Sequence, residues 1–128
     1  MARIIVVDDQ PYVRATVVAP LRASGFDVVD VEDAASALRA LESDRFDLAI
    51  VDVYMPNVDG VKLIKALRER WPELPVIAMS GVFIKDSGRT ALEFLPQLPG
   101  LADVICLKKP FRAATLLQAV RTALAVAA

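Results

Sequence analysis

Three short runs of consecutive apolar residues constrain the fold of this chain more than any other feature. They are IIVV at 4–7, LAIV at 48–51 and VIAM at 76–79. An unbroken apolar run is typical of a strand buried on both faces of a parallel sheet, whereas half-exposed strands alternate apolar and polar residues. With two further segments rich in β-branched residues, the sequence predicts five strands: Arg3–Val7, Asp27–Val31, Asp47–Val51, Pro75–Met79 and Asp103–Leu107.

Apolar residues between these strands recur at helical spacing, so each helix has one face that can lie on the sheet. The stripes are Ala34/Leu38/Leu41, Val61/Ile64/Leu67/Trp71 and Ala113/Leu117/Val120/Leu124. Asp33 and Asp59 are suited to cap the second and third helices, Gly25 to close the first, and Trp71-Pro72 to end the third. The alternation predicts an α/β fold of five β-α units in one domain, residues 1–128.

Two segments do not fit a regular pattern. Pro20 lies inside the first helical segment and cannot donate a backbone hydrogen bond to Thr16, so we expect a kink or an early helix end there. Glycines and prolines between 81 and 102 leave room for only a short fourth helix, around Arg89–Leu95.

Composition excludes several classes of function. The 128 residues include 15 basic and 16 acidic side chains, so there is no broad basic surface for nucleic acid. Histidine is absent and Cys106 is the only cysteine, which excludes an internal disulfide and a cysteine-based zinc site. The five glycines fit neither GxGxxG nor GxxxxGK spacing. The longest uncharged stretch, Leu74–Ile84, is far shorter than the roughly 20 residues of a membrane-spanning helix. We therefore expect a cytoplasmic protein without membrane or nucleic-acid partners.

Polar residues follow four of the predicted strands, and the carboxyl ends of parallel strands form the ligand-binding edge of an open sheet. They are Asp8 and Asp9, Asp52, Ser80, and Lys108 with Lys109. Each alone has a structural explanation as a helix cap, a turn residue or a solvated loop charge. Three carboxylates on one edge repel one another unless a cation neutralises them, and oxygen ligands without histidine or cysteine favour Mg²⁺. The sequence therefore predicts a carboxylate site that binds Mg²⁺ together with a phosphoryl group.

Four segments together resemble the receiver domains of two-component response regulators, over essentially the whole chain. In chain order they are VVDDQ at 6–10, VDVYMPNVDG at 51–60, AMSG at 78–81 and KKPF at 108–111. The resemblance implies a doubly wound five-stranded parallel sheet in the flavodoxin-like order 2-1-3-4-5, with helices on both faces.

The resemblance also assigns roles to the metal site. It implies that Asp52 is the phosphoacceptor and that Asp9 and Asp52 bind Mg²⁺ directly. Asp8 would act mostly through water, and the Tyr54 carbonyl would complete the protein ligands.

Two further roles follow from the same resemblance. Ser80 corresponds to the switch hydroxyl and Lys109 to the catalytic lysine, whereas Lys108 is a bystander. The Lys109-Pro110 bond is expected to be cis, which is energetically accessible for an X-Pro amide.

The implied function is phosphorelay signalling. Asp52 would take a phosphoryl group from a phosphohistidine on a sensor histidine kinase or histidine phosphotransfer protein, and the output would be contact with a downstream protein. A carboxylate attacks phosphorus in line, while Mg²⁺ and a lysine ammonium stabilise the equatorial oxygens. The domain would catalyse only its own phosphorylation and dephosphorylation and is not expected to be an enzyme with other substrates.

Two features depart from the family pattern. Cys106 stands three residues before Lys109, where the family usually carries a rotating Tyr or Phe, and it is either a packing residue, which we favour, or a redox sensor. The 28 residues between Ser80 and Lys109 are more than usual, so we expect the response to phosphorylation chiefly in the loop 81–88. The residues expected to overhang the phosphoryl group and slow its hydrolysis are Tyr54 and Val82.

Three other interpretations stay open. A receiver-like module could signal without phosphorylation, although the complete set of Asp9, Asp52, Ser80 and Lys109 argues against it. An aspartyl-phosphate type phosphatase would want a second aspartate where Tyr54 stands. The chain could also be cut from a larger regulator or hybrid kinase, although a last helix over 112–126 favours a stand-alone receiver. The cognate kinase, pathway, target and oligomeric state are not readable from the sequence.

Overall fold

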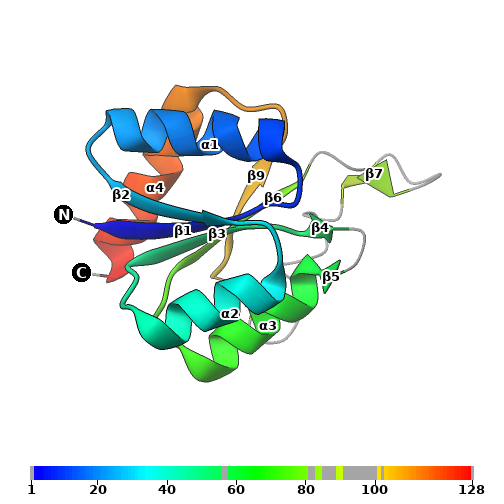
Figure 1. Ribbon diagram of the computed structural model, residues 1–128. Helices are drawn as coiled ribbons and strands as arrows, with labels where there is room; N and C mark the ends of the chain where they lie inside the picture. Colours follow the sequence, from blue (N-terminus) through cyan, green and yellow to red (C-terminus); the bar gives the residue numbers. More distant parts are fainter. Residues whose placement is uncertain are drawn as a thin grey trace.

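Five parallel strands form the central sheet of this protein, in the order β2-β1-β3-β6-β9 (Figure 1). The computed structural model describes residues 2–55, 58–80, 83–84, 89–90, 101 and 103–127. The strands are β1 (Arg3–Val7), β2 (Asp27–Val31), β3 (Leu48–Asp52), β6 (Val76–Ser80) and β9 (Ile105–Lys108). This confirms the predicted fold class and strand order.

Three of the strands end later than predicted, because backbone pairing continues past the apolar runs. β3 and β6 are shifted by one residue, so Asp52 and Ser80 are their last residues. β9 is likewise extended to Lys108, which pairs with Ser80, while Asp52 pairs with Met79. The polar residues therefore continue the strands, and the sheet itself fixes their backbone.

The helices of the described ranges cover both faces of the sheet (Figure 1). The described helices are α1 (Pro11–Ala23), α2 (Ala34–Ser43), α3 (Gly60–Arg70) and α4 (Ala113–Ala127). Buried residues form one cluster with α1 and α4 and a second with α2 and α3. Successive residues of a strand alternate between the two clusters: Ile4 packs in the first and Ile5 in the second. Both faces of the central strands are thus buried, which explains their unbroken apolar runs.

Helix boundaries follow the capping signals where these can be checked. The Ser36 amide donates to Asp33 Oδ1 at 2.7 Å, which caps α2, and Gly25 beyond α1 has a φ of 93°, the left-handed region that favours glycine. Helix α3 ends at Arg70, directly before Trp71-Pro72. The Asp59 side chain, the expected cap of α3, lies outside the described residues.

Of the two alternatives expected at Pro20, the early helix end is wrong, since α1 continues through Pro20 to Ala23, while a kink stays a prediction. Val17, Val18 and Leu21 hold this part of the helix against the sheet. Thr16, whose carbonyl loses its helical partner, lies on the exposed side, where water can satisfy it.

The expected start of a fourth helix at Arg89 is also wrong. Arg89–Thr90 form the short strand β8, which pairs antiparallel with β7 (Phe83–Ile84). The four-residue connection between these strands contains Gly88, a composition that suits a hairpin. Residues 91–100 lie outside the described part of the chain. A similar short ladder joins β4 (Tyr54–Met55) to β5 (Val58–Asp59) after β3.

The longest described helix, α4, has 15 residues. None of the helices in the described ranges combines the length and hydropathy needed to cross a bilayer.

Candidate functional site

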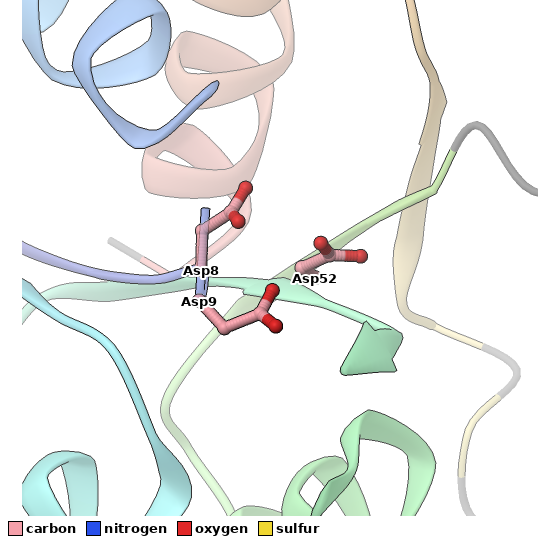
Figure 2. Close-up of side chains that lie close together, drawn as sticks. All are labelled: Asp8, Asp9 and Asp52. Atoms are coloured by element: carbon pink, nitrogen blue, oxygen red, sulfur yellow. The ribbon is translucent and has the colours of Figure 1, made fainter. Parts of the chain in front are cut away.

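Three carboxylates meet at the carboxyl ends of β1 and β3. Asp8 and Asp9 follow β1, Asp52 ends β3, and one oxygen from each lies within 4.8 Å of those of the other two. Figure 2 shows these side chains gathered beyond the two strand ends. Asp8 is 0% and Asp52 4% exposed, while Asp9 is half-buried. Since carboxylates are hard oxygen ligands, the donor set fits a divalent cation such as Mg²⁺.

Lys109 brings a positive charge into this cluster. Its Nζ lies 3.1 Å from Asp8 Oδ2 and 3.2 Å from Asp52 Oδ2. The Lys109 backbone amide donates to the Ser80 carbonyl at 3.0 Å, which fixes the chain as it leaves β9. The Lys109-Pro110 peptide bond is cis, as the resemblance implies. The ammonium offsets part of the cost of burying the two carboxylates.

The two aspartates after β1 differ in how their side chains are bonded. Asp8 Oδ1 accepts a hydrogen bond from the Gln10 amide at 2.9 Å, and Asp8 Oδ2 accepts one from Lys109. Within the described ranges, no protein group donates to the Asp9 carboxylate. Asp8 is therefore held in place by two hydrogen bonds, whereas the described protein groups donate none to Asp9.

Ser80 and Lys108 lie at the adjoining strand ends. Ser80 is fully buried as the last residue of β6, next to β3, and it pairs with Lys108 on β9. Lys108 itself is exposed, in contrast to Lys109, whose ammonium reaches the carboxylates. The structure thus brings Asp8, Asp9, Asp52, Ser80 and Lys109 to one edge of the sheet.

Two residues with expected roles cannot be placed fully. Tyr54 lies in β4, two residues beyond Asp52, but its side chain is outside the described part. Val82 also lies outside the described residues, as does most of the loop 81–88. The expected overhang of the phosphoryl group therefore stays a prediction.

Gly60 is a residue whose importance the sequence analysis missed. A Cβ atom at Gly60 would overlap the Asp52 carbonyl oxygen and the Val53 Cα. The start of α3 therefore lies directly against the backbone that carries Asp52, and only glycine fits. The available signal was its place at the end of VDVYMPNVDG, eight residues after Asp52.

Cys106 is half-buried in β9 and packs against the core cluster shared with α2 and α3. Burial raises the pKa of the Cys106 thiol. Because the thiolate is the reactive form, this environment favours the packing interpretation over a redox sensor.

Two surface hollows of the described part lie at the amino ends of the strands, away from the carboxylates. One of about 620 Å³ lies between the segments 41–47 and 70–75, which precede β3 and β6. Its lining mixes acidic, basic and apolar side chains without a convergent set of ligands. The carboxylate cluster lies instead at the carboxyl ends of β1 and β3.

Comparisons with known proteins agree with this geometry. The model of the response regulator receiver domain family matches residues 4–121. The transcriptional regulatory protein PrrA of Mycobacterium tuberculosis is 37% identical over 122 residues, which cover 95% of this chain and 49% of PrrA. The chain thus spans about half the length of this curated relative.

Two solved structures show the same architecture. The chemotaxis protein CheY4 of Vibrio cholerae superposes with a TM-score of 0.84 at 28% identity, covering 97% of this chain and 99% of CheY4. The response regulator TrrA of Thermotoga maritima, solved with Mg²⁺ and BeF, superposes at 0.81 with 26% identity, covering 97% of this chain and 100% of TrrA. TrrA has also been solved in complex with the histidine kinase ThkA. With the family match over 4–121 and this shared fold, the chain belongs to the response regulator receiver domain family.

Proposed function

We propose that residues 1–128 form one phosphoacceptor receiver domain of a two-component phosphorelay. Asp52 takes a phosphoryl group from a phosphohistidine on a sensor histidine kinase or histidine phosphotransfer protein, and the phosphorylated domain signals by contact with a downstream protein. The observation that carries this proposal is the position of Asp52. It ends the central strand with Lys109 Nζ at 3.2 Å and the oxygens of Asp8 and Asp9 close by.

The proposal includes a Mg²⁺ ion bound at the carboxylate cluster. Asp9 and Asp52 would bind Mg²⁺ directly, with the Tyr54 carbonyl as a third protein ligand and Asp8 acting through water. The three carboxylates lie close enough together for such a site, since one oxygen of each lies within 4.8 Å of those of the other two. When bound, the ion supplies positive charge against the phosphoryl oxygens.

The chain's own residues perform the transfer. The Asp52 carboxylate attacks phosphorus in line, the new O–P bond forms, and the P–N bond breaks with its electron pair moving to the histidine nitrogen. The Lys109 side chain stabilises charge on an equatorial oxygen. The Ser80 hydroxyl donates a hydrogen bond to another phosphoryl oxygen, which favours one conformation of the domain over the other.

Loss of the phosphoryl group uses the same site. Water in line with the Asp52 O–P bond attacks phosphorus, that bond breaks with its electron pair returning to the carboxylate, and inorganic phosphate leaves. The domain acts on no other substrate, so its catalysis is confined to its own phosphorylation and dephosphorylation. The complex of TrrA with a histidine kinase supports a kinase as donor.

The test is incorporation of radiolabel from a small phosphodonor such as acetyl phosphate, with Mg²⁺ present. Asp52→Asn should incorporate no label. Asp27→Asn is the matched control, because Asp27 is an exposed carboxylate that pairs with Arg3 at the other end of the sheet. It should label like the wild type. Wild-type labelling of a folded Asp52→Asn would refute the assignment.

A further inference from the structure

Arg14 on α1 contacts both strand β2 and the turn after β1 that carries Asp8 and Asp9, here called the metal-binding turn. Both contacts are made by its guanidinium group. Its Nη1 donates to the Asp8 carbonyl oxygen at 2.7 Å, and its Nε donates to Asp30 Oδ2 on β2 at 2.9 Å. The Arg14 side chain is only 18% exposed. Helix α1, the end of β1 and strand β2 therefore meet at this residue.

The hydrogen bond to Asp8 acts on the backbone that leads to Asp9. The Asp8 carbonyl and the Asp9 amide belong to one rigid peptide plane, so fixing the carbonyl oxygen fixes the rotation of that plane. On the other side, the Asp8 amide donates to the Val31 carbonyl at 3.1 Å. The backbone on both sides of the Asp8 Cα is held, and the Asp9 Cα is placed with it.

Asp9 depends on this backbone support because nothing else in the described chain holds its carboxylate. Asp8, by contrast, has both carboxylate oxygens bonded. A freely rotating Asp8–Asp9 peptide would leave the Asp9 carboxylate without a fixed position relative to Asp52.

We propose that Arg14 is a positioning residue for the metal site, oriented by Asp30 and holding the Asp8–Asp9 peptide so that the Asp9 carboxylate is preorganised for a divalent cation. The inference rests on the proposed function, since it concerns the same cation. It adds a residue that touches neither the phosphoryl group nor the metal.

The direction in which metal affinity changes when Arg14 is replaced distinguishes a positioning role from a simple charge effect. Arg14 is a cation beside a cation site, so removing its charge should by Coulomb's law strengthen metal binding. Loss of positioning should weaken it instead. Weaker binding in a variant that has lost this positive charge cannot be a charge effect.

Arg22 provides a matched control on the same helix. Its Nη2 also approaches Asp30, at 3.5 Å from Oδ1, but it donates to the Val28 carbonyl rather than to Asp8. Arg22→Gln removes the same charge and a contact with the same carboxylate without touching the metal-binding turn.

The experiment is a titration of the full chain with Mn²⁺ followed by electron paramagnetic resonance of the free ion, beside thermal unfolding without metal. Arg14→Gln should weaken Mn²⁺ binding about 10-fold, as loss of a group that orients a metal ligand typically does. Arg22→Gln should bind Mn²⁺ like the wild type. A folded Arg14→Gln variant that binds Mn²⁺ as tightly as the wild type, or more tightly, overturns the proposal.

Asp30→Asn is the second variant and decides the question if Arg14→Gln does not fold. It keeps Arg14 but weakens its anchor, so Mn²⁺ binding should fall relative to Asp27→Asn, which removes the same charge from β2 farther from the site. The comparison is made at high salt, which screens the difference in charge between the two variants but leaves a loss of positioning in place. Equal affinities for these two variants count against the positioning role. A wild-type chain that binds no Mn²⁺ refutes the metal site of the proposed function itself, which is a different result from loss of binding in the variants alone.

Discussion

Among single residues, the site pairs buried carboxylates with one lysine ammonium. Asp8 and Asp52 are almost completely buried, and one ammonium, that of Lys109, lies within 3.2 Å of both. An isolated buried carboxylate costs several kcal/mol, whereas a hydrogen-bonded ion pair recovers much of this. Asp9 is half-buried, and the described protein groups donate no hydrogen bond to its oxygens, so the proposed metal role can be tested at Asp9 without breaking such a bond.

Asp9→Asn tests that role. The substitution preserves size but removes a charged ligand from an ion that keeps most of its waters, so Mg²⁺ binding should be lost. Labelling of Asp52 by a small phosphodonor should fall and should no longer respond to added Mg²⁺. Labelling that still rises with Mg²⁺ as in the wild type would show that Asp9 is not a ligand.

Cys106 should react slowly with iodoacetamide. Because burial raises its pKa, the thiolate fraction near pH 8 is smaller than for a free cysteine, and the alkylation rate should keep rising as the pH increases beyond the usual thiol range. The measurement is the alkylation rate of the native chain against pH, with the urea-unfolded chain as reference. A native rate equal to or above the unfolded rate at pH 7 would revive the redox-sensor interpretation.

At the scale of elements, the strand ends determine the site. Unbroken apolar runs predict buried parallel strands, and such strands bring the residues that follow them to one edge. Asp8, Asp9, Asp52, Ser80 and the pair Lys108-Lys109 could therefore be found from the strand ends, whereas the choice of Lys109 over Lys108 came from the family resemblance.

Contacts between elements could not be found in the same way. The hydrogen bond from Arg14 to the Asp8 carbonyl depends on how α1 packs beside β1, and no spacing in the chain encodes it. The pairing of Arg89–Thr90 with Phe83–Ile84 was missed because glycine and proline signals mark where a helix stops, not which segments pair.

Gly60→Ala should disturb the junction of β3 and α3. The added methyl group would overlap the backbone of Asp52 and Val53, so either α3 or the end of β3 must move. Overpacking of this kind costs about 1–3 kcal/mol, measurable as a loss of free energy of unfolding in urea. Labelling of Asp52 should fall even at temperatures where the variant is fully folded.

Ala66→Gly is a control on the same helix, because it alters helix propensity by about 1 kcal/mol without approaching Asp52. If Gly60→Ala loses stability but labels like Ala66→Gly, the close contact matters for folding alone.

For the domain as a whole, the core requires stable packing, whereas signalling requires a change of conformation. Two buried clusters, one on each face, hold the sheet and its four described helices together. A signalling domain must also change between two conformations, and the phosphoryl group can shift that equilibrium only by binding one of them better. We expect the response where the chain departs most from the family, after Ser80.

Hydrogen exchange with and without a phosphoryl mimic tests this expectation. Beryllofluoride with Mg²⁺ should change amide protection across residues 81–90 more than in β1 or β3, whose amides are paired within the buried sheet. The Asp52→Asn variant under the same conditions is the control and should show no change. Unchanged protection across 81–90 in the wild type would place the response elsewhere.

Chemical mapping tests, without altering the chain, whether Asp52 itself carries the phosphoryl group. Borohydride reduction of an acyl phosphate converts the modified aspartate to homoserine, which peptide mass spectrometry locates. After phosphorylation of the wild-type chain, homoserine should appear at position 52 and at neither Asp8 nor Asp9. Homoserine at Asp8 or Asp9, with position 52 unmodified, would contradict the assignment.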